Sequence, residues 1–268
     1  MKTDIKLDIA FEDLLTLNGD EEALEKIYTE LEFKPLKNNP VKKTPEALAE
    51  ANSKYETIYE EQQLKEWAKK LDNCEAFAID TETSSLDTVS ANLLGISLSV
   101  EEEKGCYIPI GHDYEDAPKQ LSIDSVVKII GSSIVVIQDK AVGQNLKFDI
   151  PILDRHGIKL TAFLADTMLM SYVLNSTATR HSMDRMAEYY LQLSTIKYTD
   201  ITGTASKQIN FSKVDIPTAT NYAAEDADIT LRLYNHLKTL LKGQNLSLIH
   251  ISEPTRQEAI SYAVFCLK

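Results

Sequence analysis

The chain has 268 residues, of which 43% are hydrophobic and 26% charged, with only 9 Gly and 8 Pro. This composition is typical of a globular protein of about two domains and excludes fibrous and wholly disordered classes. The formal charge is −13, so any nucleic acid must be bound by local basic residues rather than by an overall positive field.

Compartment and membrane association follow from the same inventory. The three cysteines, Cys74, Cys106 and Cys266, lie far apart, a spacing that fits neither a disulfide framework nor a thiolate metal site. Charged residues stand at the N-terminus where a signal peptide needs an apolar run, and no stretch approaches the ~18 apolar residues of a membrane span. We therefore expect a cytoplasmic protein with no membrane contact.

The first 53 residues differ in character from those that follow. Residues 1–35 are acidic, and the apolar spacing within 19–33 predicts one amphipathic helix. Residues 36–53 hold prolines and a basic cluster but few large apolar groups, as an exposed linker does. We therefore expect a separate unit over 1–35, a linker over 36–53, and the main domain over 54–242.

Strand and helix patterns alternate within residues 54–242. A helix is predicted first, then three strands in a meander, and then a mixture dominated by helices. The expected elements are a helix at 61–71, strands at 76–80, 92–100 and 105–110, a helix at 123–130, a strand at 134–143, and helices at 146–156, 167–174, 183–191 and 217–241. The mixture predicts an α/β domain.

Residues 243–268 stop following either period. The string Leu-Ile-His-Ile-Ser-Glu-Pro-Thr-Arg at 248–256 resembles the translated read-through of synthetic sequencing adapters. We therefore expect this segment to be a non-native or unstructured tail.

The sharpest chemical signal is Asp80-Thr-Glu82, at the end of a predicted buried strand. Side chains two apart on a strand project from the same face, so the two carboxylates converge and need a compensating cation such as Mg²⁺ or Mn²⁺. Two further pairs have helical i, i+4 spacing: Asn145 with Asp149, and Tyr222 with Asp226. Each pair alone is more often a solvated strand end, a helix cap or a packed tyrosine than a site.

Joined in this order, Asp-x-Glu, Asn-x-x-x-Asp and Tyr-x-x-x-Asp resemble the motifs of the 3′–5′ exonuclease superfamily that uses four carboxylates and a tyrosine. Within that superfamily, residues 55–242 most resemble the proofreading domain of bacterial DNA polymerase I. The strings that carry the resemblance start at Phe77, Tyr107, Val142, Asp166, Arg180 and Tyr222. The leader also resembles the end of the 5′-nuclease domain that precedes proofreading in that enzyme.

The resemblance implies a ribonuclease-H-like (DnaQ-like) mixed sheet flanked by helices and a two-metal mechanism using Mg²⁺ or Mn²⁺. Asp80 would bridge the two ions, Glu82 and Asp226 would complete the site that activates water, and Asp149 would hold the second ion. Tyr222 would orient the nucleophile rather than act as a base, because a phenol has a pKa near ~10.

The same resemblance implies a substrate and its contacts. The substrate would be the 3′ end of single-stranded or frayed DNA, with the rest of the polymerase in cis and a monomeric chain. Leu86 would wedge against the terminal base, and the last nucleotides would contact Thr83, Gln144, Asn145, Lys147, Phe148, Arg180 and Tyr198. Phe148 stands where the family often has Tyr, and Ser182 where it has Asp, which weakens the case for polar contacts at those two positions.

Three other functions are compatible with parts of this pattern. The first is an RNA-trimming exonuclease like ribonuclease D, which a comparison of DNA and RNA substrates separates. The second is a catalytically silent scaffold, disfavoured because all four acids are present. The third is a small-molecule phosphatase, which would need a phosphate-binding Gly-rich loop that the sequence lacks.

Overall fold

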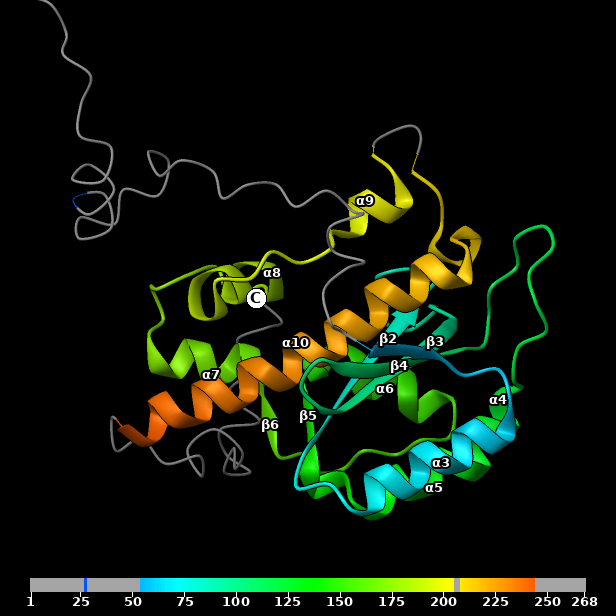
Figure 1. Cartoon of the computed structure of the whole chain (residues 1–268), viewed down its shortest axis with the longest axis horizontal. Helices are drawn as coiled ribbons and strands as arrows, with labels where there is room; N and C mark the ends of the chain where they lie inside the picture. Colours follow the sequence, from blue (N-terminus) through cyan, green and yellow to red (C-terminus); the bar gives the residue numbers. More distant parts are fainter. Residues whose placement is uncertain (1–26, 28–53, 205–207, 244–268) are drawn as a thin grey trace, which may run out of the picture. The chain divides into compact units, whose positions relative to one another are not determined.

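The computed structural model describes Ile27 and residues 54–204 and 208–243 (Figure 1). Apart from Ile27, the helix expected over 19–33 lies outside the described residues, as do the linker and the tail from residue 244 onward. None of the described helices is long and apolar enough to cross a membrane.

A six-stranded mixed sheet in the order β1-β4-β3-β2-β5-β6 forms the centre of the domain (Figure 1). As predicted, β2 (Phe77–Thr83), β3 (Leu93–Glu101) and β4 (Lys104–Pro109) form an antiparallel meander. The strands β1 (Lys54–Thr57) and β5 (Ala141–Gly143) pair parallel with β4 and β2, and β6 (Ala165–Asp166) pairs parallel with β5. This is the mixed α/β sheet that the sequence predicts.

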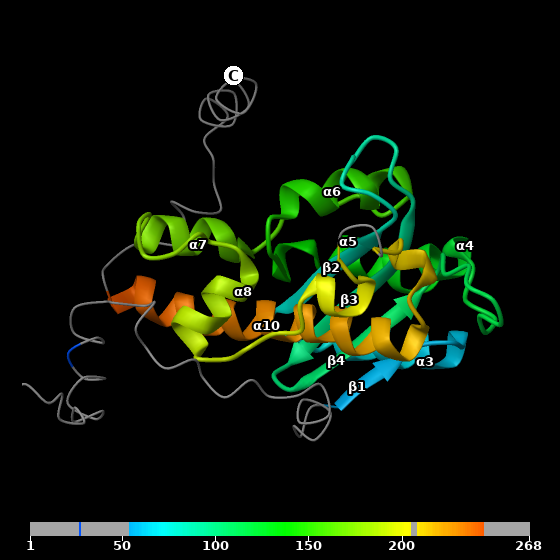
Figure 2. The same ribbon diagram turned by 90° about the horizontal axis from the view of Figure 1, so that it is seen from above.

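Helices cover both faces of the sheet. The long helix α10 (Ile216–Gly243) contacts β1 to β5 on one face and runs diagonally across them (Figure 1). Figure 2 shows α10 and α6 (Leu146–Arg155) on opposite sides of β2. The remaining helical segments are α3 (Glu61–Asp72), α4 (Ile123–Val126), η3 (Val127–Gly131), α5 (Ser132–Val136), η4 (Gln138–Lys140), α7 (Thr167–Leu174), α8 (Met183–Met186), η5 (Ala187–Leu191), α9 (Tyr198–Thr202) and η7 (Phe211–Lys213).

The alternation of β2 divides its side chains between two hydrophobic clusters. Phe77 and Ile79 belong to the cluster formed with α3, α5 and α6, whereas Ala78 belongs to the cluster formed with α7 and α10. Because side chains along a strand alternate, Asp80 and Glu82 continue the row of Ala78 and face α10. Thr81 continues the opposite row and faces α6.

The predicted strand at 134–143 is wrong except for its last three residues. Residues 132–136 form α5, and only Ala141–Gly143 is a strand. The run Ile134-Val135-Val136 has high strand propensity, but strand propensity depends on context. Here the run forms a helix that buries Ile134 in the core and leaves Val136 81% exposed.

Three short elements are missing from the sequence prediction. They are β1, β6 and α9, of four, two and five residues, and the two three-residue turns of 3-10 helix, η4 and η7, are missing as well. Elements this short contain too few residues to show a period.

Candidate active site

Asp80 and Glu82 lie toward the C-terminal end of β2, on the side that faces α10. Their partners across the meander in the register of β3 are Ser97 and Gly95. The pairing shifts register directly after Glu82, and such a bulge ends regular pairing and bends the strand. The two carboxylates are therefore held by a rigid sheet at the point where the chain leaves it.

Asp226 on α10 completes a group of three carboxylates. One carboxylate oxygen from each of Asp80, Glu82 and Asp226 lies within 4.8 Å of the others. Glu82 and Asp226 are buried, and Asp80 is half-buried. The Oδ1 atom of Asp226 is buried and has no hydrogen-bond partner. Clustered carboxylate oxygens with an unpaired buried ligand atom are the donor set that a hard divalent cation prefers.

Asp149, the fourth expected acid, lies outside this group of three. It is buried in the first turn of α6 and accepts a 2.5 Å hydrogen bond from the Thr81 hydroxyl. Thr81 separates Asp80 and Glu82 on the strand, so this bond places Asp149 next to both. The charge of Asp149 raises the pKa of each of them.

Burial raises the pKa of all four acids, and the charge of a neighbouring carboxylate, which for Asp149 is Asp166, adds to the rise. Desolvation is the larger cause for Glu82, whose pKa rises to about 8, and for Asp149, whose pKa rises to about 7. The pKa values of Asp80 and Asp226 are also raised, first by burial and then by neighbouring carboxylates. Without a cation the group therefore resists full ionisation, and a bound cation would remove that resistance.

The Tyr222 phenol lies one turn before Asp226 on α10, on the same face of the helix. Burial, followed by the charge of Asp226, raises the pKa of the phenol far above its usual value. Tyr222 therefore stays protonated. Its ring contacts the rings of both Tyr198 and Phe211, at centroid distances of 6.2 and 6.0 Å.

A family model described as 3′–5′ exonuclease of A-type DNA polymerases matches residues 55–242. DNA polymerase I of Pseudomonas aeruginosa is 39% identical over 247 residues, which cover 88% of this chain and 27% of that protein. DNA polymerase I of Borreliella burgdorferi is 38% identical over 201 residues, or 74% of this chain and 21% of that protein. The chain belongs to this exonuclease family. It spans about a quarter of the length of these relatives.

Solved structures show the same ribonuclease-H-like fold at low sequence identity. A structure of Pol1 from M. smegmatis matches with a TM-score of 0.56 and 15% identity over 74% of this chain and 29% of that one. The catalytic core of RRP6 from Trypanosoma brucei matches with a TM-score of 0.53 and 16% identity over 74% of this chain and 50% of that one. These likenesses confirm the predicted fold class.

Four expected substrate contacts of this exonuclease domain lie around the start of α6. Asn145 is the residue before the helix and adopts a left-handed backbone conformation with φ of 62°. Lys147 is exposed, and Phe148 is half-buried against the core. The Gln144 amide is engaged within the protein, because it accepts from the Thr167 hydroxyl and donates to the His181 carbonyl.

The other expected contacts come from separate segments. The Thr83 hydroxyl donates to the Ser85 carbonyl, and the Leu86 side chain in the following loop is 89% exposed. Arg180 is exposed in the loop after α7. Tyr198 begins α9, and its ring stacks on Phe211 with an interplanar angle of 12°. Whether these side chains touch nucleic acid stays a prediction.

Asp166 is a buried residue of the site region that the sequence analysis did not assign a role. Its carboxylate accepts the backbone N–H groups of Asn145 and Leu146 at the start of α6, and those of Met168 and Leu169 at the start of α7. It therefore fixes the turn from which Asp149 projects. An Asp before a helix signals a cap, but the second helix that it holds is 20 residues away and has no sequence signal.

Tyr107 and His112 form a buried hydrogen-bonded pair to which the sequence analysis assigned no role. The Tyr107 hydroxyl lies 2.8 Å from His112 Nε2, and His112 Nδ1 lies 3.0 Å from the Val214 carbonyl oxygen. The carbonyl can only accept, so Nδ1 carries the proton and the Tyr107 hydroxyl donates to Nε2. A Cβ at Gly95 would overlap the Tyr107 phenol. The small residue opposite Glu82 thus makes room for this buried ring.

Proposed function

We propose that the chain is a 3′–5′ exonuclease that requires Mg²⁺ or Mn²⁺ and removes 5′-mononucleotides from single-stranded or frayed DNA 3′ ends. The observation that carries this proposal is the convergence of Asp80, Glu82 and Asp226, with ligand atoms within 4.8 Å of one another. The chain's membership of the exonuclease family supports the assignment of that group to phosphodiester hydrolysis.

The donor set fits two divalent cations. Asp80, Glu82 and Asp226 would hold one cation. Asp80 and Asp149 would hold the second, so that Asp80 would be a ligand of both. The raised pKa values of the acids and the unpartnered Asp226 Oδ1 are expected of carboxylates that a bound cation would stabilise. When bound, such ions supply Lewis-acid charge at the scissile phosphate and lower the pKa of water.

Tyr222 would orient the attacking water by accepting a hydrogen bond from it. The oxygen of the protonated phenol keeps lone pairs that can accept such a bond. The phenol cannot serve as the base, because burial raises its pKa. Packing against Tyr198 and Phe211 holds the ring in this position.

A preference for frayed ends does not require base reading. A mispaired terminus costs less to unpair than a matched one and so reaches the site more often. With a formal charge of −13, only local cations such as Lys147 and Arg180 would attract the backbone. We therefore expect weak binding that falls steeply with salt.

One experiment separates this function from its rivals. Purified chain is incubated with a 5′-labelled single-stranded DNA or its RNA counterpart, with Mg²⁺ or with excess chelator, and products are resolved on a gel. Stepwise shortening of DNA that stops in chelator and in Asp226→Ala supports the proposal. Faster shortening of RNA would assign the ribonuclease D-like alternative, and DNA shortening in chelator would contradict the metal dependence.

We also propose the organisation around this activity. Residues 1–35 would be the end of a preceding 5′-nuclease domain, 36–53 a linker, 54–242 the exonuclease domain, and 243–268 a tail outside it. The relatives are DNA polymerases I of which the chain covers 27% and 21%, so a polymerase segment would act in cis in a full-length protein. A chain of residues 54–243 should behave as a monomer and keep the exonuclease rate within about twofold.

A further inference from the structure

The loop between β2 and β3 is ordered yet exposes two large apolar side chains. Leu86 and Val89 are 89% and 79% exposed. Asp87 holds the turn between them: its carboxylate accepts from the Val89 N–H and the Ser90 hydroxyl, and its carbonyl accepts from the Ala91 N–H. The loop is thus preorganised, although neither apolar side chain is buried.

Two side chains from other elements tie this loop in place. Arg155, the last residue of α6, donates through Nη1 to the Val89 carbonyl and through Nη2 to the Ala91 carbonyl. Asn210, just before η7, donates to the Ser84 carbonyl at 2.8 Å. Figure 2 shows the loop beside α6. The guanidinium group therefore bonds to the backbone on both sides of Ser90.

Each anchor of the loop belongs to an element that also carries the active site. The loop begins directly after β2, which supplies Asp80 and Glu82. Arg155 ends the helix whose first turn holds Asp149. Asn210 precedes Phe211, whose ring contacts Tyr222. The loop is therefore tied to the same elements that position the acids.

We propose that Arg155 is a positioning residue: it holds the loop so that Leu86 and Val89 together form an apolar contact for the base of the 3′-terminal nucleotide. This inference rests on the proposed function. A base offers an apolar face whatever its identity, so a rigid apolar contact binds 3′ ends without sequence preference. Preorganisation by Arg155 spares the cost of ordering the loop when DNA binds.

The rival role for an exposed Arg is direct attraction of a phosphate. Arg155→Lys separates the two roles, because Lys keeps the charge but cannot span two carbonyls as a planar fork does. Arg155→Ala removes both. Lys65→Ala on α3 serves as the charge control, since it deletes one exposed positive charge on a different element.

The first measurement is steady-state exonuclease kinetics on single-stranded DNA for wild type, Leu86→Ala, Arg155→Ala and the double variant. We expect Arg155→Ala to raise KM about fivefold or more with kcat within about twofold. The double variant should match the more affected single variant within about twofold, because both changes remove the same contact. If the KM of the double variant rises by the product of the two single-variant changes, the proposal is overturned. A KM in Arg155→Ala equal to that of Lys65→Ala would also overturn it.

The KM of Arg155→Lys should lie closer to that of Arg155→Ala than to that of wild type. A wild-type KM in Arg155→Lys would contradict the role of the two guanidinium hydrogen bonds. The second measurement is hydrogen–deuterium exchange of the loop without DNA or metal, which should be faster at Val89, Ser90 and Ala91 in Arg155→Ala. Unchanged exchange would overturn the positioning role whatever the kinetics. Because exchange needs no catalysis, an inactive wild type would contradict the proposed function and leave this arm readable.

Discussion

Gly105 on β4 lies against the backbone carbonyl of Ala224 on α10. A Cβ at Gly105 would stand 2.8 Å from the Ala224 oxygen, closer than real Cβ contacts allow. This contact sets how near α10 comes to the sheet. Asp226 lies two residues further along α10, so the same approach brings its carboxylate to Asp80 and Glu82.

Gly105→Ala should therefore displace α10 and damage the site. We expect a loss of about 1–3 kcal/mol in the free energy of unfolding, as for overpacking elsewhere. The exonuclease rate should fall about tenfold or more, because small misplacements of catalytic groups are costly. Thermal unfolding and single-strand degradation measure the two effects.

Gly243→Ala is the matched control for this substitution. A Cβ at Gly243, the last residue of α10, meets nothing within 4 Å. Its unfolding free energy and rate should match wild type. A Gly105→Ala protein as active and stable as Gly243→Ala would show that the close approach of α10 is not needed.

The sequence predicts those parts of the site that local geometry determines. The alternation of β2 places Asp80 with Glu82, and helical spacing places Tyr222 with Asp226. It does not predict that Asp149 arrives from the opposite face of the sheet through Thr81, since packing of helices on a sheet decides that. For the same reason Asp166, which links two helix starts, received no role.

Two aspartates two residues apart on α10 should respond in opposite ways to removal. Asp226→Ala should lower DNA degradation by at least ~100-fold, because a ligand of the catalytic cations is lost. Its melting temperature should stay at or above that of wild type, because one of several mutually repelling carboxylates is gone. Gel assays and thermal melts measure both properties, and activity within threefold of wild type would contradict the assignment of Asp226.

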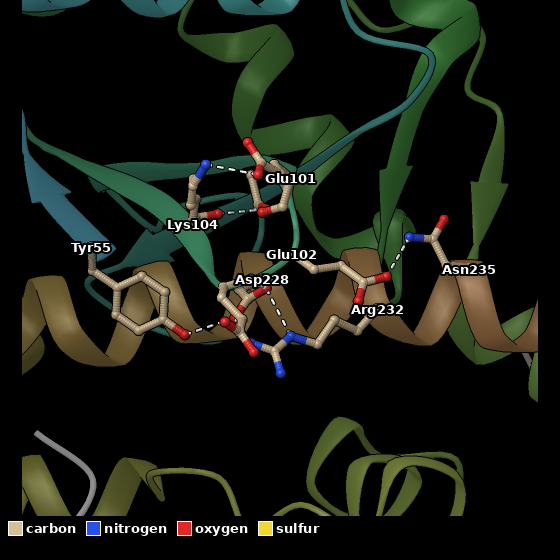
Figure 3. A network of polar contacts seen from close by, with 9 residues as sticks. Tyr55, Glu101, Glu102, Lys104, Asp228, Arg232 and Asn235 are labelled. Carbon is tan, nitrogen blue, oxygen red and sulfur yellow. Dashed lines mark hydrogen bonds and ion pairs between the residues drawn. The ribbon is translucent and has the colours of Figure 1, made fainter. Parts of the chain in front are cut away.

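Asp228, in contrast, is a buried structural acid. Its carboxylate accepts from Arg232 at 2.6 and 3.0 Å, from the Tyr55 hydroxyl at 2.9 Å and from the Glu103 N–H at 2.8 Å (Figure 3). Asp228→Ala deprives the half-buried Arg232 of its ion-pair partner and should cost about 3–5 kcal/mol of stability. A melting temperature no lower than that of Asp226→Ala would contradict this distinction.

Tyr222→Phe removes a hydroxyl but keeps the ring packed against Tyr198 and Phe211. We expect a loss of activity of about tenfold or more, since only the orienting partner of the water is lost. Affinity for Mn²⁺, measured by calorimetry, should stay near wild type because the four acids remain. A loss of Mn²⁺ affinity as large as that of Asp226→Ala would instead assign Tyr222 to holding the carboxylates in place.

The metal-free protein should lose stability as pH rises. Folding raises the pKa of Glu82 to about 8 and that of Asp149 to about 7, above the values of ~4.3 and ~3.9 in the unfolded chain. Between these limits the folded state binds more protons than the unfolded state, so the free energy of unfolding falls with increasing pH. The decline should begin above about pH 4 and continue through pH 8, where Glu82 is still half protonated, and it should level off only above the pKa of Glu82.

Thermal melts in chelator from pH 5 to 8 measure this decline, and the same melts with Mg²⁺ measure its reversal. The stabilisation by Mg²⁺ should be larger at pH 8 than at pH 5, because the cation competes with protons for the same oxygens. Glu82→Gln cannot ionise at position 82, so its chelator curve should be flatter than that of wild type. A wild-type curve that rises between pH 5 and 8, or one that Glu82→Gln leaves unchanged, would show that these acids do not control the stability of the folded domain.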